Sequence, residues 1–178
     1  GTYIESVSVS KAVYIDGGWD SSFELNDGSV YTSILYSSGT QIEFSAVKSG
    51  FCGVEGFTFS GGTGTVISVP AEGIYGGGVL CLDVSNCIIK NNIFDGCGYS
   101  DPVTFSAGGA IACVNVDSVL ISDNIISECQ AQCGGGIYLY SVNARLNGNR
   151  ITGSFPDQSY PGIRNGGSIY SAYSSIEM

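Results

Sequence analysis

The sequence predicts an all-β fold in which short parallel strands stack into a solenoid, and three observations support this. A Gly-Gly-small-aliphatic motif recurs at residues 76–79, 108–111, 134–137 and 166–169, after 32, 26 and 32 residues. A second motif begins at Asn92, Asn124 and Asn149, each 15 or 16 residues after a glycine cluster. The residues that follow the glycines read as strands, whose side chains fall on opposite faces with a period of two. Repeats of this length, which cannot bury an apolar face alone, are typical of solenoids.

Aligning the repeats on their glycines predicts two strands in each repeat, and each strand contributes two columns of inward side chains. The four columns are Val79, Ile111, Ile137 and Ile169; Cys81, Cys113, Leu139 and Ser171; Cys87, Val119 and Ala144; and Ile89, Ile121 and Leu146. Parallel strands at matching positions stack about 4.8 Å apart. Parallel crossovers are usually right-handed. We therefore predict a right-handed parallel β-helix with irregular loops that leave the stack.

The three asparagines of the second motif follow the second strand, where the chain must turn. Asparagine tolerates left-handed backbone angles, and its amide can bond to the same group one coil above and below. We expect Asn92, Asn124 and Asn149 to form a ladder with a structural role.

We expect one domain over residues 1–178, less regular in residues 1–75 and clearly repetitive in residues 76–178. Residues 54–59 match residues 89–94 in pattern, which indicates an earlier copy of the repeat. Loops are expected at residues 19–31, 100–107 and 155–165, the last two because they contain prolines. The chain starts and stops in strand-like patterns without a secretory leader, so we expect a fragment of a longer chain.

The charge balance is strongly acidic, with a formal net charge of −10 and six basic residues. Nucleic acids and anionic membranes are attracted by basic surfaces, so neither is an expected partner. The chain has no run of about 18 apolar residues, so no segment is expected to insert into a bilayer.

The seven cysteines cannot all pair within one chain. Cys97 and Cys129 each lie five residues after a ladder asparagine, so stacking brings their α-carbons within disulfide range. Cys133 competes as the partner of Cys129. A zinc site is not expected, because a second close cysteine pair and histidines are both missing.

Catalytic residues are not expected either. A polysaccharide lyase needs a base and a cation near the reacting carbon, whereas here histidine is absent and the basic residues are scattered. A glycosidase needs two carboxylates in one groove. The local acidic cluster comprises Asp83, Asp95, Asp101, Asp117 and Asp123, which fall in different columns and read as turn residues. We expect no cofactor; calcium is the ion that such acids would suit, although the nonapeptide of calcium-loaded β-rolls is absent.

The outward face of the glycine-led strand carries apolar side chains where a solvent-exposed strand would carry polar ones. We call this set the outer strip; its main members are Leu80, Leu82, Val114, Tyr138, Tyr140 and Tyr170. Something is expected to cover it: a loop of the same chain, a second protein, or a sugar chain stacked on the tyrosines. The sequence leaves these three alternatives open.

Several segments resemble secreted right-handed β-helix repeat proteins of bacteria and archaea. They are residues 2–5, 7–11, 13–19 and 54–62, and residues 108–111 are also similar to the Gly-Gly-Ala-Ile repeats of polymorphic outer-membrane adhesins. The resemblance spans nearly the whole chain and implies an extracellular or cell-surface location. It implies the fold more strongly than the function, because the same helix carries lyases, hydrolases, adhesins and fibres.

Two functional hypotheses follow. The first is a non-enzymatic extracellular module, structural or adhesive, that associates with itself or with other surface proteins through the outer strip and open coil ends, as in a fibre or surface layer. The alternative is a carbohydrate-active enzyme or polysaccharide-binding module. A groove beside residues 100–107 and 155–165 with two carboxylates within about 10 Å would favour the enzyme.

Overall fold

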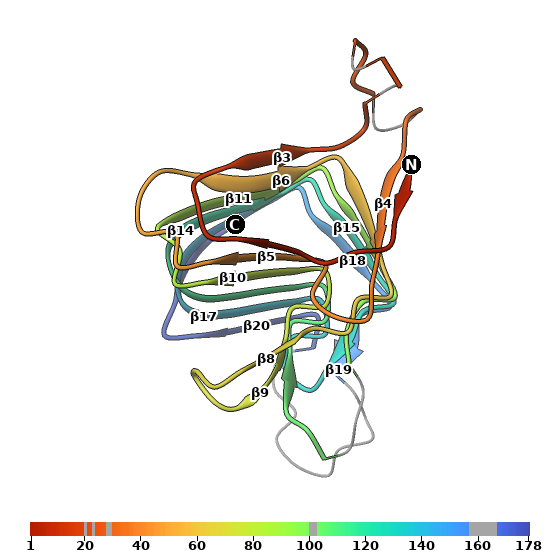
Figure 1. Cartoon of the computed structure of the whole chain (residues 1–178). Helices are drawn as coiled ribbons and strands as arrows, with labels where there is room; N and C mark the ends of the chain where they lie inside the picture. Colours follow the sequence, from red (N-terminus) through yellow and green to blue (C-terminus); the bar gives the residue numbers. More distant parts are fainter. Residues whose placement is uncertain (20, 23, 28–29, 100–102, 157–166) are drawn as a thin grey trace.

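The computed structural model describes residues 1–19, 21–22, 24–27, 30–99, 103–156 and 167–178. Short parallel strands wind around a core in successive coils, and Figure 1 shows the coils stacked behind one another. The described residues form strands, turns and irregular segments, without a helix among them. The predicted all-β fold with parallel stacked coils is confirmed.

One wall of the solenoid is a 6-stranded parallel sheet. Its strands, in spatial order, are β1 (Thr2–Tyr3), β4 (Ser33–Tyr36), β7 (Phe57–Ser60), β12 (Ile93–Asp95), β15 (Ile125–Ser127) and β18 (Arg150–Thr152).

The other two walls belong to a 10-stranded parallel sheet, which bends because β14 and β17 run through both walls. The first of these walls contains β2 (Val7–Val9), β5 (Ile42–Ser45), β10 (Val79–Leu82), the start of β14 (Ile111–Ser122), the start of β17 (Ile137–Asn147) and β20 (Ile169–Ala172). The second contains β3 (Tyr14–Asp16), β6 (Cys52–Glu55), β11 (Asn86–Lys90), the remainders of β14 and β17, and β21 (Ser175–Glu177).

A coil thus has three strands, and the prediction of two strands for each repeat was wrong. The missed strand follows the ladder asparagine; it buries Phe94 in β12 and Ile126 in β15, while Ile151 in β18 is half-buried. With only three residues in each of these strands, the alternation is too short to stand out in the sequence. The rings of Phe59 and Phe94 stack here with centroids 4.7 Å apart.

The recurring glycines are required by the backbone at each coil. Gly76, Gly108 and Gly134 have φ angles of 59°, 65° and 58°, where a side chain would be strained. In the first two motifs the next glycine packs against the coil beyond: a Cβ on Gly77 would lie 2.4 Å from the carbonyl oxygen of Gly109, and a Cβ on Gly109 would lie 2.2 Å from that of Gly135. Close stacking of coils therefore explains why this motif is retained from repeat to repeat.

The predicted register between repeats is confirmed. Val79 pairs with Ile111, Ile111 with Ile137, and Ile137 with Ile169. The expected copy at residues 54–59 also pairs with residues 89–94, split between β6 and β7. The register between β14 and β17 shifts between Val116 and Val119. A residue missing from this turn explains why Asn149 follows its glycines by 15 residues rather than 16.

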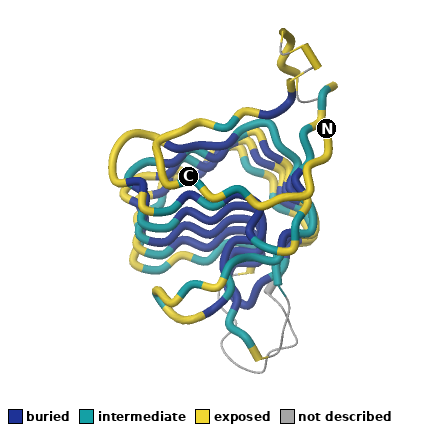
Figure 2. Tube along the Cα trace, viewed as in Figure 1, coloured by how far each residue is buried: buried dark blue, intermediate teal, exposed yellow. Residues whose placement is uncertain are grey.

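Two smaller sheets lie outside the stack. One contains β8 (Thr65–Ile67), β9 (Gly73–Tyr75) and β13 (Ser106–Ala107), and the other contains β16 (Gln130–Ala131) and β19 (Phe155–Pro156). Figure 1 shows the β8–β9 hairpin standing beside the wall that holds β10, β17 and β20. The main core fills the solenoid, and Figure 2 shows buried residues along its inner walls.

Candidate functional site

The ladder asparagines lie one above another at the turn into the 6-stranded sheet. The Nδ2 group of Asn92 donates to Oδ1 of Asn124 at 3.2 Å, and Nδ2 of Asn124 donates to Oδ1 of Asn149 at 2.9 Å. Each asparagine also accepts a backbone N–H from the coil before it; in the earliest case the donor is Phe57. The side chains are thus engaged with the protein itself, which fits a structural role.

The outer strip is covered by the chain itself, which is one of the three alternatives that the sequence left open. The hypothesis that the strip is an exposed surface for association was wrong. Leu80 and Val114 are fully buried and Tyr138 is 3% exposed, while Leu82, Tyr140 and Tyr170 are half-buried. The covering side chains come from the β8–β9 hairpin, from the segment around β13 and from Cys133, which bridges Ala107; they are Ile67, Tyr75, Phe105, Ala107 and Cys133. The physical reason is that an excursion from the stack folds back onto the apolar strands and removes them from water.

The seven cysteines are all described, and all are buried free thiols. Cys97 and Cys129 lie on neighbouring coils, since Gly98 bridges Gln130 directly after them. The neighbouring thiol of Cys129 lowers the pKa of Cys97, while Sγ of Cys129 donates to the carbonyl oxygen of Ser127 at 3.2 Å. The predicted bridge between Cys97 and Cys129 stays a prediction.

The described members of the acidic cluster that the sequence suggested, Asp83, Asp95, Asp117 and Asp123, are not gathered at one pocket. Asp83 and Asp123 occupy turns with φ angles of 55°, and Asp95 accepts a hydrogen bond from the Ser127 hydroxyl at 3.0 Å. Asp101 and most of the predicted loop at residues 155–165 lie outside the described residues. A small crevice lies beside Tyr99 and Ser106, and the described residues that line it include no carboxylate. The groove that would have favoured an enzyme is thus not found in the described part of these loops.

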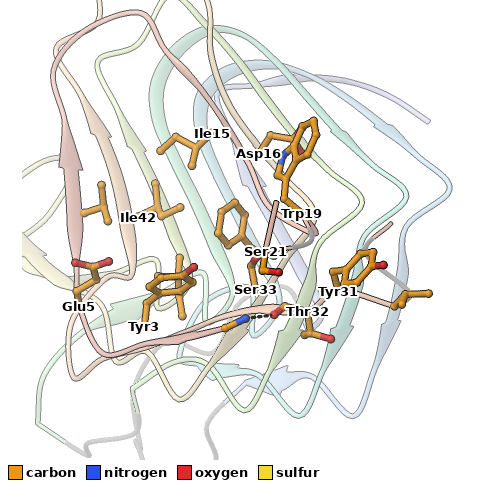
Figure 3. A pocket seen from close by; sticks show the side chains of 15 residues that line it. Tyr3, Glu5, Ile15, Asp16, Trp19, Ser21, Tyr31, Thr32, Ser33 and Ile42 are labelled. Carbon is orange, nitrogen blue, oxygen red and sulfur yellow. Dashed lines mark hydrogen bonds between the residues drawn. The ribbon is translucent and has the colours of Figure 1, made fainter. Parts of the chain in front are cut away.

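A pocket of about 660 Å³ lies instead at the N-terminal end of the solenoid, and we call it the mouth pocket. Its floor consists of core side chains from the first coils, including Leu35 and Ile42. Figure 3 shows Tyr3 and Glu5 on one side of this space and Trp19 and Tyr31 on the other. Its further polar and apolar lining residues are Val7, Ile15, Asp16, Ser21, Val30, Thr32, Ser33 and Phe57.

The aromatic side chains of the mouth pocket are accessible to a ligand. Tyr3 is 48% exposed and Trp19 is 37% exposed, although both are large and partly apolar. Trp19 is held by an antiparallel bridge to Asn26, and the amide of Asn26 donates to Oδ2 of Asp16 at 2.9 Å. The connection between β3 and β4 thereby places an aromatic ring and a carboxylate beside the open end of the core.

A second cavity of about 550 Å³, which we call the side groove, adjoins the mouth pocket, because Asp16, Thr32 and Phe57 line both. The side groove runs past Glu55, Asn91, Asn92, Asp123 and Ile125 along the turn into the 6-stranded sheet. Asp16 and Glu55 are in-register neighbours on β3 and β6. Two carboxylates therefore meet on adjacent coils at this groove.

Glu55 is held in the ionised form by its surroundings. Its carboxylate accepts hydrogen bonds from the Tyr14 hydroxyl at 2.7 Å and the Asn91 amide at 2.8 Å, and lies 3.0 Å from Nζ of Lys90. Partial burial acts to raise the pKa of Glu55, but these donors outweigh burial and lower the pKa below its usual value. A carboxyl group in this state does not hold a proton to give to a leaving group near neutral pH.

Sequence reasoning missed the mouth pocket and the side groove. Their residues come from the less regular half of the chain, which the repeat alignment does not reach. The available signal was the concentration of aromatic and acidic residues in the first 36 positions, which include Tyr3, Trp19 and Tyr31. The sequence could not reveal that Trp19 and Tyr31 lie together at the open end of the coil.

Metal sites and membrane-spanning helices are both absent from the described residues. These residues contain no group of three or more histidine, cysteine or acidic side chains arranged to hold a metal ion. They also contain no helix of the length and hydrophobicity needed to cross a membrane.

Comparison with known proteins identifies the family of the chain. Searches of curated proteins and of solved structures gave no significant match. The sequence model of one family, described as "Right handed beta helix region", matches residues 8–177. This match covers almost the whole chain and agrees with the three walls of stacked parallel strands. The chain therefore belongs to the right-handed β-helix family.

Proposed function

We propose that this β-helix is a non-catalytic polysaccharide-binding module that holds a sugar chain in the mouth pocket. The observation that carries the proposal is the meeting of Tyr3, Trp19 and Tyr31 with Glu5 and Asp16 around one open space. Small-molecule sites are commonly concave, mostly apolar, about 300 to 1,000 Å³ in volume, and equipped with a few polar groups. The mouth pocket has each of these properties.

The lining favours a sugar over other ligands. Aromatic rings offer a flat apolar surface for the C–H face of a pyranose, and they lose little conformational entropy on binding. The hydroxyls of Ser21, Thr32 and Ser33 and the carboxylates are suited to hydrogen bonds with sugar hydroxyls. Because the chain carries a net charge of −10, a neutral or basic sugar is favoured over a uronic acid or sulfated sugar.

Binding without cleavage is supported by the state of the side groove. A glycosidase needs one protonated carboxyl and one ionised carboxylate across the scissile bond. Glu55 has its oxygens occupied by three donors and a lowered pKa, so it is a poor proton donor. We assign the side groove to extended contact with the sugar chain rather than to catalysis.

The experiment uses Trp19, which is the single tryptophan of the chain. Its emission is followed while the protein is titrated separately with cellohexaose, xylohexaose, chitohexaose and oligogalacturonate. We expect a blue shift with at least one neutral or N-acetylated oligosaccharide, since the sugar removes water from the indole. Tyr3→Ala should weaken this binding about tenfold, which corresponds to losing about 1.4 kcal/mol of contact. Tyr173→Ala, in a turn of the last coil, is the matched control.

Two results would contradict the proposal. One is an unchanged emission spectrum with every oligosaccharide of the panel. The other is binding that Tyr3→Ala and Tyr173→Ala weaken equally, since Tyr173 is 85% exposed and does not line the mouth pocket. Release of reducing sugar during the titration would instead support the enzymatic alternative.

The proposed location is the cell surface or the extracellular space. Its support is the resemblance to secreted β-helix repeat proteins together with a polysaccharide as the proposed ligand. Fractionation of the source cells, followed by immunodetection, tests this location, and detection only in the cytoplasm would contradict it.

A second candidate function is a structural module that stacks end to end in a fibre or surface layer. It is favoured by the half-buried apolar side chains Val7 and Ile15 in the first coil and Ile169 and Ile176 in the last. Among the described residues, the outer edges of these coils have no further strand paired to them. Parallel strands with free edges recruit other strands. The outer strip plays no part in this end-to-end association, because other segments of the chain cover it.

A further inference from the structure

Four of the buried thiols form a cluster inside the solenoid, at the corner where β10 turns into β11. Cys81 and Cys113 are in-register neighbours in one wall, and Cys52 and Cys87 are in-register neighbours in the next. The two pairs meet across the corner, where Sγ of Cys81 lies 3.2 Å from Sγ of Cys87. Cys81 is fully buried and Cys87 is 2% exposed.

We propose that Cys81 and Cys87 are a disulfide-forming pair, a thiol modification site that ties two walls of the β-helix together. A disulfide bond is about 2.05 Å long, so the two sulfurs need to approach by only about 1 Å. The two residues are separated by a turn that includes Asp83, with a φ angle of 55°, so their side chains face one another from strands that meet at an angle. The proposal does not depend on the proposed polysaccharide binding.

The other contacts in the cluster are less suited to a bond. Cys81 with Cys113, and Cys87 with Cys52, stand on adjacent coils with side chains that point the same way. In-register parallel strands are about 4.8 Å apart. Disulfides prefer a Cβ–Cβ separation of about 3.5 to 4.5 Å. The pair that faces across the corner is therefore favoured over the pairs along the stack.

The chemistry is thiol–disulfide exchange with a small aliphatic disulfide such as oxidised glutathione. The thiolate of Cys87 attacks one glutathione sulfur and releases the first glutathione thiolate. The thiolate of Cys81 then attacks Sγ of Cys87 in the mixed disulfide and releases the second. Two protein thiols are oxidised, one glutathione disulfide is reduced, and the two protons pass to the released thiolates. Because both thiols are buried, the exchange takes place before the coil closes.

The test begins with the full chain refolded from guanidinium in a buffer of oxidised and reduced glutathione. Free thiols are then alkylated, and the protein is cut before aspartate and after glutamate. This digest places Cys52, Cys81, Cys87 and Cys113 on separate peptides, namely residues 44–55, 73–82, 83–94 and 101–116. We expect mass spectrometry to find residues 73–82 linked to residues 83–94. The same digest reports on Cys97 and Cys129.

Recovery of residues 73–82 and 83–94 as alkylated, unlinked peptides would overturn the proposal, and so would their linkage to residues 44–55 or 101–116. The peptide map of the unmodified sequence decides this without any variant. A second readout is thermal unfolding: the oxidised chain should melt about 5 °C higher than the reduced chain. Cys87→Ala should reduce this shift, whereas Cys133→Ala, which removes a thiol from the separate cluster beneath the β8–β9 hairpin, should retain it in full. A shift of the same size in Cys87→Ala as in the unmodified sequence would also contradict the pairing.

Discussion

Single polar side chains fix how consecutive coils sit on one another. Asn124 is fully buried, and its Nδ2 group donates to the carbonyl oxygen of Ile89 at 2.8 Å as well as to Asn149. Its Oδ1 accepts from the backbone N–H of Asn92 at 3.0 Å. A shift of one residue in the register between coils would separate these buried groups from their partners. The ladder therefore specifies the stacking as well as stabilising it.

We predict that Asn124→Ala lowers the free energy of unfolding by about 3 kcal/mol, because it leaves buried donors and acceptors unpaired. Denaturation by urea, followed by circular dichroism, measures the change. The matched control is Asn143→Ala: Asn143 is exposed and donates to the carbonyl oxygen of Asp117 at 2.9 Å. This control should cost less than about 1 kcal/mol. If the two variants lower the free energy of unfolding equally, the asparagine ladder does not make a special contribution to stability.

At the scale of elements, the β8–β9 hairpin turns an apolar outer wall into a second core. Tyr75 of β9 meets Tyr138 of β17 with ring centroids 5.6 Å apart, and Tyr138 stacks on Tyr170 at 5.2 Å. The hairpin and the solenoid wall thus bury much of each other's apolar surface. A polar outer face on these strands would have left the hairpin without a surface to pack on.

We predict that Tyr138→Ala destabilises the protein by about 3 to 5 kcal/mol, the usual cost of truncating a buried aromatic side chain. Proteolysis should then cleave within residues 63–75, since the hairpin loses its main contact. Tyr173→Ala is the control, because Tyr173 is 85% exposed. It should change stability by about 0.5 kcal/mol or less. Resistance of the hairpin to proteolysis in Tyr138→Ala would show that other contacts hold it.

At the scale of the whole molecule, stability is distributed along the stack, because each coil contacts only its neighbours. The central strands β10, β11 and β14 have pairing partners on both sides, whereas β1, β2 and β3 have partners on one side among the described residues. The mouth pocket lies at this one-sided end. An end of the core with strands paired on one side can accept either a sugar chain or another coil, so this feature is compatible with both candidate functions.

End-to-end stacking makes a prediction for the whole molecule. If the second candidate function is correct, sedimentation velocity should show association that increases with protein concentration, since a head-to-tail contact does not close on itself. Ile176→Asp should abolish the association by placing a charge on the last coil, while circular dichroism remains that of a folded β-protein. Ser175→Asp, on the exposed neighbouring position, should have a smaller effect. A chain that remains monomeric at every concentration would eliminate this candidate.

The repeats could be recognised in the sequence because the backbone of each coil requires the same residue types at the same positions. Gly77 and Gly109 are held by close approach between coils, and Asn92 and Asn124 by mutual hydrogen bonds, so both motifs recur at the spacing of a coil. The candidate site could not be recognised in the sequence, because its residues are not part of a repeating pattern. Tyr3, Trp19 and Tyr31 belong to no repeat, and their proximity depends on where the connection between β3 and β4 returns.

The sequence by itself determined the stacked coils, the register of the inward columns and the position of the asparagine ladder. Each of these follows from local backbone geometry repeated at a regular interval. Only the tertiary structure decided what covers Leu80, Val114 and Tyr138, how Cys81 meets Cys87, and where the open pocket lies. These outcomes depend on contacts between segments that share no repeat, and such contacts are set by the folding of the whole chain.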